Sequence, residues 1–173
     1  LIEVLRAIGE STVSIDIQQQ DIKAAFDEDA AVDQLLRAVA ERKAAGVAVR
    51  ILVSPKYSWD RSLDSVDAYD LGDTIQAIDL NRFTHLHNKG IIFDRQKVLV
   101  TSTNWSNNSI TKAREAGVLI ESTAIAQYFT KTFDQDWEAA IPRGDVASHL
   151  IDIRRQIDEQ AEGLIQLDAV PTP

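Results

Sequence analysis

The sequence predicts an α/β fold, specifically a three-layer α/β/α sandwich around a mixed central sheet. Two strand-like runs, residues 12–17 and 47–53, flank a helical pattern between residues 27 and 46. A strand, a helix and a second strand joined by short connections imply a parallel pair. Residues 89–101 hold two apolar, β-branched runs around a polar turn, which predicts an antiparallel hairpin. A sheet with both kinds of pairing is therefore expected.

The first third of the chain contributes a helix, a strand and a second helix. Residues 1–9 carry apolar side chains at helical spacing, and Gly9 begins the polar stretch that stops them. The second helix is expected to be capped by Asp27 or Asp29 and to be closed by Gly46, because short polar residues favour helix starts and glycine favours helix ends.

The rest of the chain alternates between loops, strands and helices. Residues 55–72 lose their periodicity and are expected to form a loop with a short helix, whereas residues 74–80 and 115–120 read as strands. Ser122 is expected to cap a further helix, and the chain ends in an amphipathic pattern. The expected buried stripe of the helix after Ser122 consists of Ile125, Tyr128, Phe129, Phe133 and Trp137.

Composition fits one folded domain and limits the function classes. The chain has 173 residues, 45% of them hydrophobic, with a net charge of −9, which argues against a broad nucleic-acid-binding surface but leaves room for a small cationic pocket. It has no cysteine, which excludes disulfides and thiolate metal sites, and no apolar run approaches the roughly 20 residues of a membrane span. Because it starts at Leu1 inside an amphipathic pattern and lacks methionine, it is interpreted as part of a longer polypeptide.

Polar residues gather at the open end of the predicted hairpin. Strand alternation from His85 onward would set His87 and Lys89 on one face. If the turn is symmetric about residues 95–96, Ser102 lies opposite Lys89, and Asn104 lies opposite His87. An imidazole, an ammonium, a hydroxyl and a carboxamide would then meet at one place.

This pattern resembles the HKD motif of the phospholipase D superfamily, HxKxxxxDxxxxxxGSxN. His87 and Lys89 are followed at the motif spacing by Asp94, and then by Ser102 and Asn104. The one departure is Thr101 at the position of the family glycine. The resemblance implies a phospholipase D/nuclease-like fold, with an HKD phosphodiesterase domain over residues 1–142 that holds a single motif copy, followed by a C-terminal amphipathic helix and frayed tail over residues 143–173.

The residues of the motif match the needs of phosphodiester cleavage, which requires a nucleophile, a clamp for negative charge and an acid for the leaving oxygen. His87 is the candidate nucleophile, with Glu115 as the carboxylate that orients its ring. Lys89 and Asn104 would bind the nonbridging phosphate oxygens, and Ser102 could add a hydroxyl donor. The resemblance further implies a covalent phosphohistidine intermediate, no metal and no other cofactor.

Four further residues are weaker candidates. Asp94 belongs to the motif but falls at the turn on the opposite strand face, so a structural role is expected. Tyr57 and Trp59 either line the substrate mouth or pack within their loop. Gln20 is a candidate substrate contact because residues 15–22 are similar to the strand written IYIENQFF in second halves of tandem phospholipases D.

The reaction needs a second catalytic histidine, and this chain holds one HKD signature. Either two copies form a homodimer or the other motif lies upstream in the same protein, and the strand at 15–22 favours the second arrangement. The substrate is expected to be a phospholipid, because of the acidic charge and the tandem-like strand. A nuclease of the same superfamily is the alternative, and a noncatalytic dimerisation or binding module is a third hypothesis.

Overall fold

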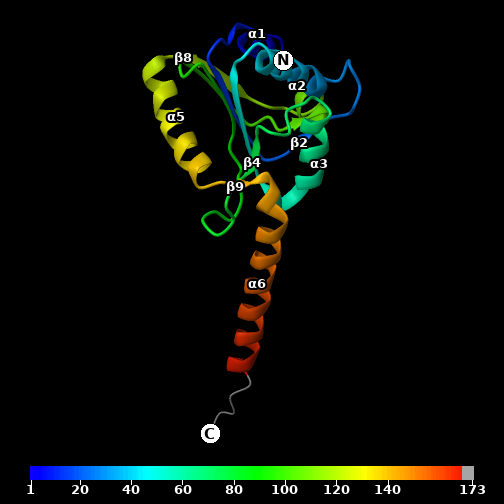
Figure 1. Ribbon diagram of the computed structural model, residues 1–173, viewed down its shortest axis with the longest axis vertical. Helices are drawn as coiled ribbons and strands as arrows, with labels where there is room; N and C mark the ends of the chain where they lie inside the picture. Colours follow the sequence, from blue (N-terminus) through cyan, green and yellow to red (C-terminus); the bar gives the residue numbers. More distant parts are fainter. Residues whose placement is uncertain (169–173) are drawn as a thin grey trace.

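The computed structural model describes residues 1–168, and for Tyr57 and residues 161–168 it describes the backbone alone. Its centre is one mixed sheet (Figure 1). The strands of this sheet are β1 (Ser14–Gln19), β3 (Ala48–Val53), β4 (Ile75–Ala77), β5 (Lys89–Phe93), β6 (Lys97–Thr101), β8 (Gly117–Glu121) and β9 (Ile141–Pro142). They lie in the order β8-β6-β5-β1-β3-β4-β9, so the β5–β6 hairpin sits between the edge strand β8 and the central strand β1.

Pairing within the sheet is parallel on one side and antiparallel on the other. β1 pairs with β3, and β3 with β4, in parallel. β5 runs antiparallel to β1, and β6 runs antiparallel to both β5 and β8. The predicted mixed sheet is confirmed, and the parallel pair arises as expected from the strand-helix-strand segment.

Helices cover both faces of the sheet. They are α1 (Ile2–Glu10), α2 (Ala31–Ala44), α3 (Pro55–Asp67), α4 (Asn107–Thr111), α5 (Thr123–Glu138) and α6 (Val146–Asp168), with a 3₁₀ turn at Arg143–Asp145. In Figure 1, α5 lies on one side of the sheet and α1, α2 and α3 lie on the other. A separate two-stranded sheet joins β2 (Ile22–Lys23) to β7 (Trp105–Ser106) in parallel. The α/β/α prediction is therefore confirmed.

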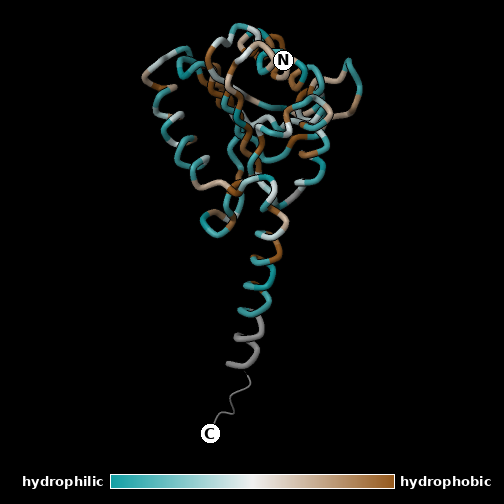
Figure 2. The backbone as a smooth tube through the Cα atoms, in the orientation of Figure 1, coloured by the Kyte–Doolittle hydropathy of each residue, from teal (hydrophilic) through white to brown (hydrophobic). Residues whose placement is uncertain are grey.

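The two faces of the sheet belong to two hydrophobic clusters. Ile15, Ile17 and Ile91 point toward α1 and α2 and are at most 1% exposed. Ile92 and Val98 point toward α5, where they pack with Phe133. Figure 2 shows the hydrophobic residues concentrated in the central strands. Burial of this apolar surface is the main driving force that holds the hairpin in its place.

The segment after β3 is mostly helical, whereas a loop with only a short helix was expected. The Ser54 hydroxyl accepts a hydrogen bond from the Lys56 backbone N–H, and Pro55 occupies the first helical turn. Both features favour a helix start, which the missing periodicity of this stretch concealed. The irregularity is confined to a kink at Ser58, with φ −160° and ψ 41°.

The start of α2 also differs from the prediction. Its N-cap residue is Ala30, which has no side-chain cap, so neither Asp27 nor Asp29 caps the helix. Asp27 instead accepts a hydrogen bond from the backbone N–H of Asp29. The polar residues of this stretch order the loop before the helix. Gly46 follows the helix end with φ +91°, the left-handed conformation expected for a closing glycine.

Helix α5 exposes apolar side chains that were expected on its buried stripe. Ser122 caps α5 as expected, but Tyr128 is 71% exposed and Ile125 is 41% exposed. The buried face of α5 is rotated toward Ala126, Thr130 and Phe133. α6 begins at the core with Val146 and then extends away from the body (Figure 1). Across residues 1–168, no helix combines the length and the apolar character needed to cross a bilayer.

Candidate functional site

The β5–β6 hairpin is shifted by one residue from its predicted register. Lys89 pairs with Thr101, and Phe93 pairs with Lys97. The hairpin is centred on Arg95 because Asp94 and Arg95 both adopt left-handed backbone angles, with φ 52° and 57°. The predicted pairing of Lys89 with Ser102 is therefore wrong. Ser102 lies just beyond β6, where it pairs with the loop before β8 through the Ala116 carbonyl.

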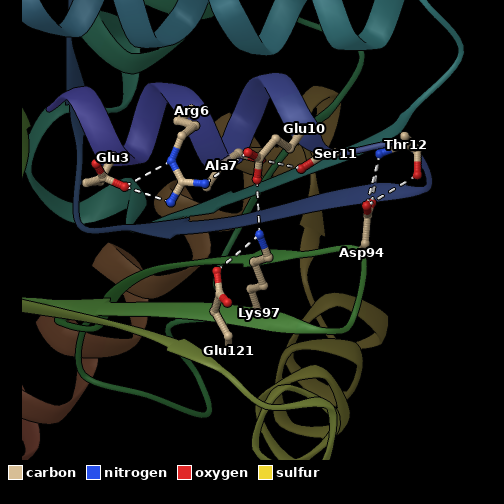
Figure 3. A network of polar contacts seen from close by, with 9 residues as sticks. All are labelled: Glu3, Arg6, Ala7, Glu10, Ser11, Thr12, Asp94, Lys97 and Glu121. Carbon is tan, nitrogen blue, oxygen red and sulfur yellow. Dashed lines mark hydrogen bonds and ion pairs between the residues drawn. The ribbon is translucent and has the colours of Figure 1, made fainter.

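The turn end of the hairpin is fixed by Asp94 (Figure 3). Its carboxylate accepts hydrogen bonds from the backbone N–H groups of Thr12, Val13 and Ser14, at 3.0, 2.8 and 2.9 Å. Burial alone would raise the pKa of Asp94, but these hydrogen bonds hold that pKa below its ordinary value. Asp94 thus ties the hairpin to the start of β1, and its bonding fits the structural role expected for it.

The open end of the hairpin carries the cation of the motif. Lys89 is the first residue of β5 and is 6% exposed, and its Nζ donates a hydrogen bond to the His87 carbonyl at 2.8 Å. Burial lowers the pKa of Lys89, while the negative charges of Asp21 and Glu115 act in the opposite direction. A poorly hydrated ammonium of this kind favours binding of an anion.

The candidate nucleophile precedes the strand instead of lying within it. His85 and His87 belong to the loop that leads into β5, so the expected strand from His85 onward begins four residues later. Both rings are exposed and lie edge to face, with ring centroids 5.7 Å apart. His87 and Lys89 line one pocket of about 350 Å³, which runs beneath α5 past Tyr128 and Phe129. An exposed imidazole beside a buried ammonium is thus open to a ligand.

Glu115 lies in the loop before β8 and is hydrogen-bonded to Ser102, the residue that follows β6. Its carboxylate accepts hydrogen bonds from the hydroxyls of Ser102, at 2.5 Å, and Ser109, at 2.6 Å. These bonds lower the pKa of Glu115, so the carboxylate stays charged near Lys89. The Ser109 hydroxyl also accepts a hydrogen bond from the backbone N–H of Asn104. Among the described residues no hydrogen bond joins Glu115 to His87, and its orienting role stays a prediction.

Two carboxamide side chains at this end have buried polar atoms without a hydrogen-bond partner. Asn104 Oδ1 is buried and unpaired, and so are both amide atoms of Gln19, a fully buried residue. Sequence reasoning selected Gln20 and missed Gln19, although the alternation of Ile15, Ile17 and Gln19 marks an inward-facing series. Asp21, 6% exposed and paired with Lys23 at 2.7 Å, was also missed.

The remaining sequence candidates are Trp59, Tyr57 and Gln20. Trp59 is 8% exposed and packs in the main hydrophobic cluster, which fits the packing alternative, although the segment that carries it is a helix. The Tyr57 side chain lies outside the described residues. Gln20 is half-buried, and its carbonyl accepts the Ser54 backbone N–H. Within the described residues, no group of three or more His, Asp or Glu side chains could hold a metal ion.

The sequence is similar to a known protein family and to curated proteins. Residues 4–137 match the family model described as "Cardiolipin synthase, PLD-like domain". Among curated proteins, the 5′-3′ exonuclease PLD3 of Xenopus laevis is 28% identical over 117 residues, which are 66% of this chain and 24% of that protein. The matched segment therefore spans about a quarter of the length of the curated relatives.

Solved structures show the same fold at low sequence identity. Nuc from Salmonella typhimurium, a phospholipase D family member, superposes with a TM-score of 0.68 at 23% identity, covering 82% of this chain and 88% of that one. The phosphatidylserine synthase of Haemophilus influenzae Rd KW20 superposes with a TM-score of 0.63 at 15% identity, covering 88% of this chain and 41% of that one. With the family model matching most of the chain, this protein belongs to the PLD-like domain family, within the phospholipase D superfamily of phosphodiesterases.

Proposed function

We propose that this chain supplies one HKD half of a phosphodiesterase that works through a phosphohistidine. An imidazole nitrogen of His87 attacks phosphorus and forms the N–P bond, while the bond from phosphorus to the first alcohol breaks. The departing oxygen takes a proton from a second acid. Water or another alcohol then attacks the phosphorus, displaces the imidazole and completes hydrolysis or transfer.

The observation that carries this proposal is the unsatisfied polar cluster at the open end of the hairpin. The Lys89 ammonium is buried and donates one hydrogen bond, to the His87 carbonyl, and Asn104 Oδ1 is a buried acceptor that receives no hydrogen bond. Buried polar groups without partners are costly, so their retention supports a ligand that completes them. A phosphate fits the Lys89 ammonium, because its nonbridging oxygens accept hydrogen bonds from the spare N–H donors, and Asn104 would offer its Nδ2 donor to the same oxygens once its amide turns over.

Glu115 and Ser102 complete the proposed half-site. The lowered pKa of Glu115 keeps the carboxylate ionised, and an ionised carboxylate can accept the ring N–H of a neutral His87 imidazole. Ser102 donates to Glu115 and is exposed, so it could also turn its hydroxyl toward a phosphate oxygen. Gln20 remains a proposed substrate contact of lower weight.

A second histidine must protonate the leaving oxygen, and we place it in a second HKD half. That half lies either upstream in the same protein or in a second copy of this chain. The favoured substrate is a phospholipid, supported by the net charge of −9 and by a pocket beside His87 that continues over Val98 and Phe133. A nucleic acid is the alternative, and the relatives' names include both an exonuclease and a lipid synthase.

The full protein should be assayed side by side on phosphatidylcholine vesicles and on single-stranded DNA. Turnover of the vesicles supports the lipid proposal, whereas exclusive cleavage of DNA overturns it in favour of the nuclease. The His87→Asn variant, assayed on the same two substrates, tests whether His87 is the nucleophile. This variant should lose at least about a thousandfold in kcat, because the nucleophile is removed.

Two controls separate chemistry from folding. His85→Asn removes the neighbouring imidazole and should leave kcat within a few-fold of the parent, because that ring has no role in the proposed chemistry. Acid-stable and acid-labile phosphate should be compared after rapid quenching, since a phosphohistidine is acid-labile. Unchanged turnover in His87→Asn would support the noncatalytic dimerisation or binding module instead.

A further inference from the structure

Gln19 is a buried carboxamide that the proposed chemistry does not use. It is fully buried on β1, and neither its Oε1 nor its Nε2 has a hydrogen-bond partner. Such a group has lost its hydration without gaining a replacement, which destabilises the folded state. An apolar side chain of the same size would fit a buried strand position better. The presence of an amide therefore calls for a ligand or a neighbour that uses it.

The neighbour on the adjacent strand is Lys89. Ile17 pairs with Ile91, and Gln18 pairs with Gly90, so the next step of the same antiparallel register sets Gln19 beside Lys89. Both residues continue the face that carries Ile17 and Ile91, since strand side chains alternate. A carboxamide oxygen and an ammonium on one face of paired strands are within reach of each other, either directly or through one water.

The Lys89 ammonium has N–H donors that are not used within the described structure. An ammonium carries three N–H donors, and the structure gives one of them an acceptor, the His87 carbonyl. The charged and titratable groups around it are Asp21, Glu115 and His87, of which Asp21 is engaged by Lys23 and Glu115 by two serine hydroxyls. The unpaired oxygen of Gln19 is thus the acceptor left over on the β1 side.

We propose that Gln19 is a positioning residue that acts through Lys89. A buried water bridges the two side chains: it accepts an N–H of the ammonium and donates to the Gln19 side-chain oxygen, and this bridge holds the charge toward the bound phosphate. The coupling between the two side chains stands on the strand register alone. Its catalytic consequence rests on the proposed function.

The coupling is tested by titrating Lys89 in the substrate-free full protein. NMR of isotopically labelled lysine side chains resolves its signal, which is assigned by its loss in Lys89→Met. Because the amide oxygen favours the charged ammonium, Gln19→Leu should lower the pKa of Lys89 by about half a unit or more, and Gln19→Glu should raise it. If Gln19→Leu fails to fold, Gln19→Asn, whose amide falls one methylene short, should lower the pKa in the same direction.

Gln18 provides the matched control. It neighbours Gln19 but faces α5, where its amide bonds to Asp136 at 3.1 Å. Gln18→Leu should therefore leave the pKa of Lys89 unchanged. Opposite shifts in the two Gln19 variants, with none in Gln18→Leu, support the proposal. A Lys89 pKa that is the same in Gln19→Leu and in the parent overturns it.

Kinetics and stability provide the second readout. Gln19→Leu should lower kcat/KM about tenfold, with the alkaline limb of the pH profile moved to lower pH, while the melting temperature stays level or rises. If Gln19 is merely structural, Gln19→Leu should raise the melting temperature and leave kcat/KM unchanged. That result overturns the positioning role. If the parent protein proves to lack phosphodiesterase activity, the proposed function fails, and the NMR titration still decides the coupling.

Discussion

The two ends of the β5–β6 hairpin use the motif residues in opposite ways. At the turn, Asp94 is saturated by three backbone N–H groups from the entry to β1. At the open end, Lys89 keeps spare donors and Asn104 keeps a buried oxygen without a partner. Full satisfaction stabilises a fold, whereas incomplete satisfaction leaves binding capacity for a ligand. One short sequence pattern thus combines a structural anchor with a proposed anion site.

The sharpest test of this division is removal of the cation at the open end. Lys89→Met keeps the length and apolar stem of the side chain but deletes the ammonium. We expect kcat/KM to fall about a thousandfold, equivalent to about 4 kcal/mol of transition-state stabilisation, because developing phosphate charge loses its clamp. The melting temperature should not fall, since a buried charge is replaced by an apolar group.

Steady-state kinetics and thermal unfolding on the same preparation measure both effects. Lys112→Met, a change in the exposed segment after α4, serves as the charge-matched control. A Lys89→Met protein that unfolds more easily yet retains its activity would reverse the roles assigned to the two ends.

Removal of the anchor at the turn should have the opposite profile. Asp94→Ala removes the acceptor of three backbone N–H groups, two of which lie in the exposed entry to β1. We therefore expect the free energy of unfolding to fall by about 2–3 kcal/mol. Chemical denaturation measures this loss. Once folded, the variant should keep kcat within a few-fold, because Asp94 lies at the far end of the hairpin from His87.

The anchor also makes a pH prediction with a defined sign. The pKa of Asp94 is lowered in the folded state, so its contribution to stability is fully present above the unfolded value of about 3.9 and is lost as pH falls through the folded pKa. The parent should exceed Asp94→Asn in unfolding free energy at neutral pH, and the gap should shrink below about pH 4. A constant gap across this range would show that the carboxylate charge is not what holds the turn.

The difference between the ends also marks how far sequence reasoning could reach. The hairpin, the mixed sheet and the motif were predictable because strand alternation and motif spacing are local signals. The hairpin register was not predictable, because it depends on left-handed angles at Asp94 and Arg95. Asp94 is held in place by backbone N–H groups from the distant entry to β1. Likewise, the Gln19 alternation was visible, but its lack of partners could be seen only after folding. The loop position of His87 has the same origin, since the pairing with β6 begins only at Lys89.

A smaller effect is expected where Thr101 replaces the family glycine. Thr101 pairs with Gly117, and a Cβ added to Gly117 would lie 2.9 Å from Thr101 Oγ1 and 3.0 Å from Thr101 Cβ. Gly117→Ala should therefore cost about 1–2 kcal/mol of unfolding free energy through overpacking. Thr101→Gly in the same molecule should recover the part that comes from the clash, which a double-mutant cycle measures. Additive effects would show that the two positions do not compensate each other.

The smallest effect on stability is expected from removing the ion pairs of Lys97, near the Asp94 turn. Lys97 bridges Glu10 of α1 and Glu121 of β8, at 3.1 and 3.2 Å (Figure 3), but the carboxylates are largely exposed. Exposed pairs contribute little because water and salt screen them, so Lys97→Ala should leave the unfolding free energy almost unchanged in chemical denaturation. The difference should shrink further at about 1 M salt, where screening acts over a few ångströms. A larger, salt-insensitive loss would mean that the charges around the turn, and not the hydrogen bonds of Asp94, hold this end of the hairpin.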